Sequence, residues 1–406
     1  MTLVVPYFFA HQPFRLWPPD KRTNGAVLSP KELENYYFEQ SYDEEIFNKV
    51  ANKCYRPATK LILHLITKHA NDPKPFRVNY GLSGTLIDQA EKFAPDLVDL
   101  WRQLAATGLV EFTGETYYHS LSSLFDDERR EFAEQVLLHS ARIKDLTGRA
   151  PTVFRNTEMM YNNGIAETVQ QLGFKGIITE GVDWLMAGWR SSDFVYNSPT
   201  GLSVLLRNYK LSDDVGYRFS NKAWEGYPLT AEKFAGWLAA NTDPVVLLAL
   251  DYEALGEHMW ADTGIFDFVA ALPEQVGKHP QLEWANATDA VERIPSTGTI
   301  DVPAFSTISW ADKERDTSAW LGNAMQQYCY EELKQMEDSV KATNDPNVLR
   351  TWRLMQTSDH LYYISDKAMS DGDVHQYFSA YGSVVEAFVR LHTAVYDLAR
   401  RAEMWS

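Results

Sequence analysis

Residues 245–251 read Val-Val-Leu-Leu-Ala-Leu-Asp, a continuous apolar run that ends on a carboxylate. Such a run, without alternating polar residues, is typical of a strand buried on both faces, as in parallel sheets that helices cover. Asp251 at its end must lose part of its hydration, so it needs a compensating reason to be there. This stretch therefore predicts both a buried parallel sheet and a candidate functional carboxylate.

Similar apolar runs recur along the chain and alternate with segments that have helical spacing. Strands are expected at residues 3–9, 61–66, 76–80, 109–113, 152–154, 176–179, 203–206 and 245–250. Helices are expected at residues 44–54, 85–93, 127–146, 164–172, 231–240 and 264–276. Alternating strands and helices indicate an α/β fold with a parallel sheet covered on both faces. About eight such units fit a closed β/α barrel better than an open sheet.

The pattern changes toward the C-terminus. Residues 294–303 contain two prolines and a glycine, which is typical of a linker. Further helices are expected at residues 317–340, 348–364 and 376–403. Asp316 is placed to cap the first of these helices. The chain is therefore predicted to divide into a catalytic β/α barrel of residues 1–295 and a helical subdomain of residues 296–406 that closes one side of a cleft.

Composition excludes several classes of protein. The 406 residues have a net charge of −17, whereas nucleic-acid binding requires clustered positive charge. No run reaches the ~18–20 apolar residues that span a bilayer, and the N-terminal run lacks the basic residues of a secretory signal. Cys54 and Cys329 form no disulfide framework, which suits a reducing compartment. We expect a cytoplasmic protein with neither a nucleic-acid nor a membrane partner, and the sequence leaves its oligomeric state open.

Polar side chains follow four of the predicted strands. In a β/α barrel, the chemistry lies in loops just past the C-terminal ends of the strands. These loops contain His11-Gln-Pro13, Gly114-Glu-Thr-Tyr-Tyr-His119, Arg155-Asn-Thr-Glu158 and Asp251-Tyr-Glu-Ala-Leu-Gly-Glu-His258. Segments distant in sequence thus deliver His, Glu and Asp to one rim, where we expect the active site.

Two kinds of chemistry use such a set. His11, His119, His258 and Asp251 are residue types that bind zinc, but their spacing is not a compact zinc motif. Alternatively, Glu158 and Asp251 form a carboxylate pair for cleaving a glycosidic bond, one attacking and the other protonating the leaving oxygen. Aromatic residues make up 13% of the chain and supply flat surfaces for sugar rings, which favours the second chemistry.

These motifs, in this order, resemble the sequence regions of glycoside hydrolase family 57. The fifth region matches Thr351-Trp-Arg-Leu-Met-Gln-Thr-Ser-Asp359, and residues 309–323 resemble the amylase-like branch of the family. The resemblance runs from residue 11 to residue 359. It implies an incomplete (β/α)7 barrel with a C-terminal α-helical subdomain, in an intracellular enzyme that acts on α-glucans such as starch and glycogen.

Matching positions carry over the expected roles. The resemblance implies that Glu158 is the nucleophile and Asp251 the general acid/base of a retaining hydrolase that cleaves α-1,4-glucosidic bonds through a covalent glycosyl-enzyme. Roles in holding the sugar or orienting the carboxylates are implied for His11, Glu115, His119, Glu253, His258 and Asp359. Trp352 is either a substrate platform or part of the core. No cofactor and no metal is implied.

Three other functions stay open at the level of the sequence. A 4-α-glucanotransferase uses the same two carboxylates but passes the sugar to another sugar instead of water. A metal-dependent polysaccharide deacetylase uses a related barrel, with the histidines and Asp251 around an ion. A glucan-binding protein without catalytic activity shares the fold but lacks a competent site.

Overall fold

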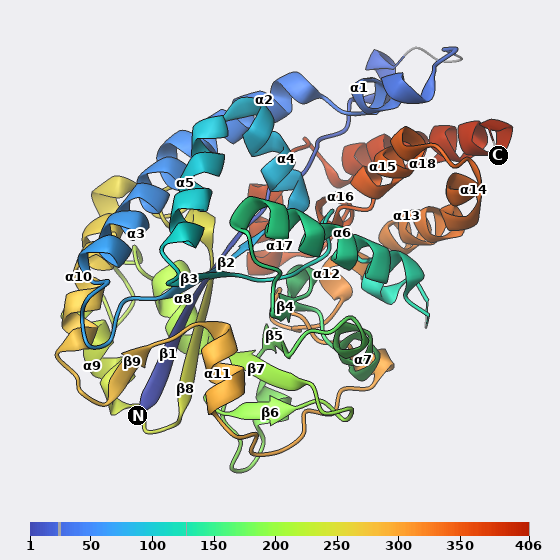
Figure 1. The fold of residues 1–406 in the computed structure, drawn as a ribbon. Coiled ribbons are helices and arrows are strands. Elements are labelled where there is room, and N and C mark those ends of the chain that lie inside the picture. Colours follow the sequence, from blue (N-terminus) through green and yellow to red (C-terminus); the bar gives the residue numbers. More distant parts are fainter. Residues whose placement is uncertain (23–25, 127, 406) are drawn as a thin grey trace.

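A computed structural model describes residues 1–22, 26–126 and 128–405 (Figure 1). Its centre is a parallel sheet with the strand order β3-β2-β1-β8-β7-β5-β4. These strands are β1 (Thr2–Ala10), β2 (Val78–Leu82), β3 (Val110–Phe112), β4 (Val153–Arg155), β5 (Gly176–Glu180), β7 (Ser203–Arg207) and β8 (Val245–Asp251). Two short strands join the sheet, β6 (Val195–Asn197) antiparallel to β7 and β9 (Leu282–Trp284) parallel to β1.

The alternation of strands and helices favoured a closed barrel, but the barrel is incomplete between β3 and β4. Among the described residues, these two strands are bridged only where Gly114 follows β3. The Gly114 amide donates to the Val153 carbonyl, and the Arg155 amide donates to the Gly114 carbonyl, both at 2.9 Å. A Cβ at Gly114 would lie 2.6 Å from the Phe174 ring, so this close approach requires glycine. The contact brings the loops after β3 and β4 side by side.

Helices cover the outside of the sheet, and side chains fill its two faces. These helices are α2 (Gln40–Val50), α3 (Arg56–Lys68), α4 (Gly84–Phe93), α5 (Pro95–Ala106), α6 (Arg130–Thr147), α7 (Asn163–Gln171), α8 (Tyr209–Gly216), α9 (Ala231–Ala240) and α10 (Ile265–Gly277). Helix α1 (Leu33–Tyr37) packs instead with the C-terminal helices, and α11 (Ala287–Arg293) packs in the inner cluster. Along β1, Val4 and Phe8 pack under the helices, whereas Val5, Tyr7 and Phe9 join the inner cluster. This alternation explains why the whole of β1 is buried and reads as a continuous apolar run.

The C-terminal part is helical, as predicted, and its apolar core also includes side chains from residues 14–38 and 117–125. Its helices are α12 (Ser318–Leu321), α13 (Ala324–Gln335), α14 (Glu337–Ala342), α15 (Pro346–Met355), α16 (Ser358–Tyr362), α17 (Met369–Phe378) and α18 (Val384–Trp405). Figure 1 shows α13, α14, α15 and α18 gathered on one side of the barrel. As expected, the Asp316 carboxylate accepts a hydrogen bond from the Ser318 amide at the start of α12, at 2.8 Å.

The structure corrects several element predictions. Residues 61–66, predicted as a strand, lie within α3, because Ile62, Leu65 and Ile66 are buried on one face at helical spacing. Strands β6 and β9, of three residues each, were not predicted. Each of the three long C-terminal helices is broken into shorter ones. The incomplete (β/α)7 barrel with a helical C-terminal region is confirmed.

The predicted linker packs closely against the barrel. The Ile300 amide donates to the Asn197 carbonyl of β6 at 2.8 Å, and Ile300, Val302 and Ile308 belong to a barrel core cluster. The segment therefore continues as part of the barrel wall and leads the chain to Trp310. The division between residues 1–295 and 296–406 remains a prediction.

A buried ion pair joins the two parts. The Glu131 carboxylate of α6 accepts hydrogen bonds from Arg353 Nε at 2.7 Å and Arg353 Nη2 at 2.9 Å, both from α15, and both side chains are almost fully buried.

Replacing Arg353 with Met leaves the buried carboxylate of Glu131 with fewer hydrogen-bonding partners. We expect the free energy of unfolding, measured with urea, to fall by about 3 kcal/mol. Arg102→Met breaks an exposed pair with Asp99 and is the control expected to change it little. Equal effects of the two substitutions would contradict this account.

Candidate active site

Glu158 lies just past the end of β4, in a short 3-10 helix over Thr157–Met159. Its Oε1 accepts hydrogen bonds from His119 Nε2 at 3.0 Å and Ser358 Oγ at 3.1 Å, and its Oε2 accepts one from Trp310 Nε1 at 2.8 Å. Burial alone would raise the pKa of Glu158, but His119, the positive charge of Arg155 and the hydrogen bond from Trp310 outweigh burial and hold this pKa below the ordinary value. Glu158 is therefore an ionised carboxylate at neutral pH.

The backbone around Glu158 takes an unusual conformation. His119, Glu158 and Met159 all have left-handed backbone angles, with φ of 50°, 54° and 53°. Non-glycine residues in this region store strain, which clusters at functional sites. The turn is held in place because the Met159 amide donates to Asn156 at 2.9 Å and the Trp310 amide donates to Glu158 at 3.3 Å. The fold thus fixes the position of this carboxylate at an energetic cost.

Asp251 ends β8 and faces the same cavity as Glu158, a space of about 620 Å³. Burial and the negative charge of Glu158 raise the pKa of Asp251 to about 6, although Arg155 and Arg207 oppose this shift. The sequence-predicted residues that line this cavity are His11, His119, Glu158, Asp251, Glu253, His258 and Asp359. The two carboxyls therefore share one cavity but titrate in different pH ranges.

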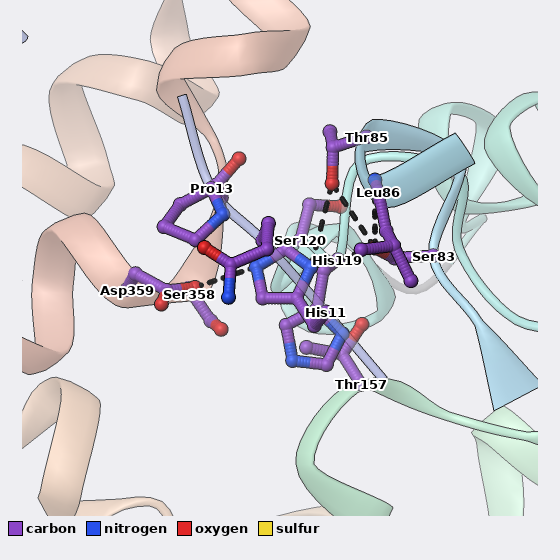
Figure 2. A network of polar contacts seen from close by, with 12 residues as sticks. His11, Pro13, Ser83, Thr85, Leu86, His119, Ser120, Thr157, Ser358 and Asp359 are labelled. Carbon is purple, nitrogen blue, oxygen red and sulfur yellow. Dashed lines mark hydrogen bonds and ion pairs between the residues drawn. The ribbon is translucent and has the colours of Figure 1, made fainter. Parts of the chain in front are cut away.

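His11 connects three segments that are far apart in sequence (Figure 2). Its Nδ1 lies 2.8 Å from Ser83 Oγ, and its Nε2 lies 2.9 Å from Asp359 Oδ2. Burial alone would raise the pKa of Asp359, but its interaction with His11 outweighs burial and holds this pKa well below the ordinary range. His11 therefore ties the end of β1 to the start of α4 and to α16.

Four flat side chains lie next to one another at the site. The ring of His11 lies 4.2 Å from that of His119, His119 lies 5.0 Å from Phe9, and the Arg155 guanidinium lies 3.8 Å from the Phe9 ring centre. Burial and the neighbouring His11 lower the pKa of His119 to about 4, so His119 is neutral at pH 7. Neutral His119 donates to Glu158 when its proton is on Nε2.

Glu115 and Arg155 lie close together in the buried floor of the site. Within the described residues, neither carboxylate oxygen of Glu115 and none of the guanidinium nitrogens of Arg155 has a hydrogen-bonding partner. Burial raises the pKa of Glu115 well above its ordinary value, and the charge of Arg155 only partly offsets this. Glu115 is fully buried and does not line the cavity, which favours orienting the site over holding the sugar, and its role stays a proposal.

The other expected residues occupy different depths. Glu253 lines the cavity and accepts a hydrogen bond from Tyr55, and burial and the charge of Asp251 raise its pKa to about 8. His258 also lines the cavity, with its Nδ1 3.4 Å from the Tyr377 hydroxyl, and burial lowers its pKa. A substrate-platform role for Trp352 is wrong: its ring is fully buried in the helical core and donates to the Leu333 carbonyl at 2.9 Å.

Some residues at the site were not predicted from the sequence. Trp310 comes from the segment that resembled the amylase-like branch, but nothing in the sequence assigned it to Glu158. Arg207 and Arg315 also line the cavity and both contact the buried Glu180, at 2.9 and 2.7 Å. Arg207 ends β7 and Glu180 ends β5, so the rule that located Asp251 could have located these two residues as well.

The indole of Trp310 provides a direct test of how Glu158 is held. Trp310→Phe removes a hydrogen bond to a charged group, which is worth about 1.5–3 kcal/mol. We expect kcat/KM to fall roughly 10- to 100-fold and the acid limb of the pH profile to move to higher pH, because the pKa of Glu158 rises. Trp320→Phe is the matched control, since the indole nitrogen of this buried tryptophan has no partner among the described residues. Equal losses in both variants would contradict this role.

Comparison with known proteins identifies the family of the chain. The model of glycosyl hydrolase family 57 matches residues 7–303. The chain belongs to this family. A protein of Methanocaldococcus jannaschii, named "Putative alpha-amylase", is 44% identical over 398 residues, which are 96% of this chain and 82% of that protein.

Solved structures of the family show the same fold. A 4-alpha-glucanotransferase from Thermococcus litoralis superposes with a TM-score of 0.69 at 13% identity over 100% of this chain, which spans 60% of that chain. A branching enzyme from Thermococcus kodakaraensis gives a TM-score of 0.65 at 13% identity over 98% of this chain and 90% of that chain. At such low identity these likenesses support the fold alone.

Two further features concern metal binding and membrane insertion. In residues 1–22, 26–126 and 128–405, no group of three or more His, Cys, Asp and Glu side chains is arranged to hold a metal ion. None of the helices within these ranges combines the length and the apolar character that crossing a bilayer requires.

Proposed function

We propose that this member of family 57 is a retaining hydrolase of α-1,4-glucosidic bonds in α-glucans. One observation carries the proposal: two carboxyls that face one cavity have pKa values shifted in opposite directions. Glu158 is ionised over a wide pH range, whereas Asp251 still holds a proton near pH 6. A retaining mechanism requires one group of each kind.

In the first step, the Glu158 carboxylate attacks the anomeric carbon and the glycosidic C–O bond breaks. Asp251 gives its proton to the departing oxygen, so a covalent glycosyl ester forms and the shortened glucan leaves. In the second step, the Asp251 carboxylate takes a proton from water, and this water attacks the anomeric carbon and releases Glu158. Retention requires the two carboxyls about 5–5.5 Å apart.

The surrounding residues serve these two groups. His119, Ser358 and Trp310 hold Glu158 by three hydrogen bonds, which leaves little freedom for the attacking oxygens. We expect the ionised Asp359 and the neighbouring His11, which both line the cavity, to bind sugar hydroxyls. Glu253, with its raised pKa, adds no second negative charge beside Asp251 at neutral pH.

The walls of the cavity fit a sugar polymer. Aromatic side chains that line it are Phe9, Tyr42, Tyr217, Trp310, Tyr362, Tyr363, Tyr377 and Phe378. Flat apolar rings with polar edges suit sugar rings, which have apolar faces and hydroxyl rims. The names of the relatives refer to amylase, glucanotransferase and branching activity, which supports an α-glucan as the substrate.

A product profile tests this function. The purified protein is incubated with maltoheptaose and with glycogen, and the products are separated by length and anomeric form. We expect chains shorter than the substrate, released initially as the α-anomer. Chains longer than maltoheptaose would instead indicate a glucanotransferase, and release of the β-anomer would contradict retention. Binding without any turnover would indicate a glucan-binding protein.

A chelator separates the carboxylate mechanism from a metal-dependent deacetylase. We expect the same rate of glucan cleavage with and without the chelator, because the proposed chemistry uses Glu158 and Asp251 alone. Activity that disappears with the chelator and returns with zinc would contradict the proposal. Release of acetate from an acetylated polysaccharide is the matching positive test for the deacetylase.

We also propose a cytoplasmic location. Cys54 and Cys329 are both buried, and neither is disulfide-bonded in the part of the chain that the structure describes. Two thiols without a bridge suit a reducing compartment. Fractionation of the source cells, with the protein detected by an antibody, checks this.

A further inference from the structure

A second cavity, of about 900 Å³, shares a wall with the active-site cavity. The wall is the loop of residues 309–316, which is closed by a hydrogen bond of 3.0 Å from the Ser309 amide to the Arg315 carbonyl. Trp310 lines the active-site cavity, Glu314 lines the second cavity, and Arg315 lines both. A ligand in the second cavity is therefore next to the loop that holds Glu158.

Two aromatic side chains in this second cavity are exposed to solvent. Phe305, in a short 3-10 helix over Ala304–Ser306, is 92% exposed, and Trp184, in another over Asp183–Met186, is 54% exposed. Large apolar rings at a hollowed, polar-rimmed surface are typical of ligand-binding grooves. Their flat faces suit the apolar face of a sugar ring.

The charges in the second cavity select against an ionic ligand. Its lining contains three acidic residues, Asp126, Glu314 and Asp316, and three basic residues, Arg129, Arg315 and Lys334. Three carboxylates against three cations give no net attraction for a phosphate backbone or an anionic lipid surface. Mixed donors and acceptors beside aromatic rings match a neutral polyhydroxylated chain.

We propose that the second cavity binds a stretch of the same α-glucan polymer that the active site cleaves. This inference rests on the proposed function for the choice of ligand. A long chain seated against Phe305 and Trp184 raises the local concentration of cleavable bonds at the neighbouring active site. A short oligosaccharide held entirely in the active-site cavity gains nothing from it.

The test compares long and short substrates in a double variant, Trp184→Ala with Phe305→Ala. Both side chains are exposed, so their removal leaves the core intact. We expect KM for glycogen to rise about tenfold, equivalent to about 1.4 kcal/mol, with kcat/KM for maltotriose unchanged. Tyr396→Ala is the matched control, because this α18 side chain is 53% exposed and is outside the lining of both cavities. A KM for glycogen within about twofold of the parent would overturn the proposal, as would an equal loss on maltotriose.

A binding measurement keeps this inference separate from the proposed function. The protein carrying Glu158→Gln, with and without the double substitution, is run in native gels that contain glycogen. We expect glycogen to slow the single variant and to slow the triple variant much less. Equal retardation of the two, or none in either, would overturn the second binding site. If the parent cleaves no α-glucan, the proposed function fails, whereas loss of retardation in the triple variant still supports the site.

Discussion

Glu158→Gln is expected to lower kcat on maltoheptaose roughly 10⁴-fold, with little change in stability or glucan binding. The amide keeps the size of the carboxylate. Its oxygen can still accept the hydrogen bond from Trp310 Nε1, and its NH2 group then faces His119 Nε2, which accepts when the neutral ring has its proton on Nδ1. The amide has no negative charge and cannot form the glycosyl ester. Initial rates on maltoheptaose measure the loss, and calorimetric binding of the same oligosaccharide confirms an intact site.

A second variant distinguishes the nucleophile from a residue that is needed only for binding. Glu158→Ala leaves a space beside the anomeric carbon that a small anion such as azide can enter. With azide and 4-nitrophenyl α-maltoside, we expect rescue of nitrophenol release and formation of a β-glycosyl azide, because attack comes from the face that Glu158 normally uses. An α-glycosyl azide, or activity near that of the parent in Glu158→Gln, would remove Glu158 from this role.

The sequence predicted much of the fold because its strands are buried on both faces. The apolar runs of β8 and β1 could be recognised as strands from the sequence alone. Helices cover one face of the sheet and the inner cluster covers the other, so nearly every residue of these strands is apolar. The same reasoning failed for residues 61–66, because a helix with a wide buried face also gives a short apolar run. Periodicity alone does not separate these two cases.

The site was predictable in part for a topological reason. Parallel strands place their C-terminal ends at one rim, so His11, Glu158 and Asp251 could be expected to meet although they lie far apart in the chain. Trp310 was not predictable, because it reaches Glu158 through an irregular loop, and no strand or helix period describes that path. The role of Trp352 was ambiguous, because the sequence does not show whether a tryptophan ring is buried in a core or exposed as a substrate platform.

Asp251→Asn is expected to slow cleavage of maltoheptaose by about 10²–10⁴-fold, the usual contribution of a general acid. The size of the loss should depend on the leaving group. Sugar hydroxyls leave poorly without a proton, whereas 4-nitrophenolate leaves without one. We therefore expect formation of the glycosyl-enzyme from 4-nitrophenyl α-maltoside to be affected much less, as measured by the burst of nitrophenol in stopped flow.

The pH profile gives an independent test of the same residue. An acid must be protonated to act, and burial together with Glu158 raises the pKa of Asp251 to about 6. In the parent, kcat/KM on maltoheptaose should therefore be high below pH 6 and fall about tenfold per pH unit above it. The acid limb belongs to Glu158, whose pKa lies below its ordinary value, so it should appear at a pH below the ordinary range of a glutamate.

The Asp251→Asn substitution should remove the alkaline limb, because the amide that replaces the carboxyl cannot titrate. Glu253→Gln is the matched control: Glu253 also lines the cavity and has a pKa raised to about 8, but it takes no part in proton transfer in the proposed mechanism. If Asp251→Asn keeps the alkaline limb near pH 6 and Glu253→Gln loses it, Glu253 is the acid and the assignment of Asp251 is wrong. The alkaline limb also depends on Glu158, because part of the raised pKa of Asp251 comes from the negative charge of Glu158. In Glu158→Gln, which lacks this charge, the alkaline limb of the residual activity should therefore move to lower pH.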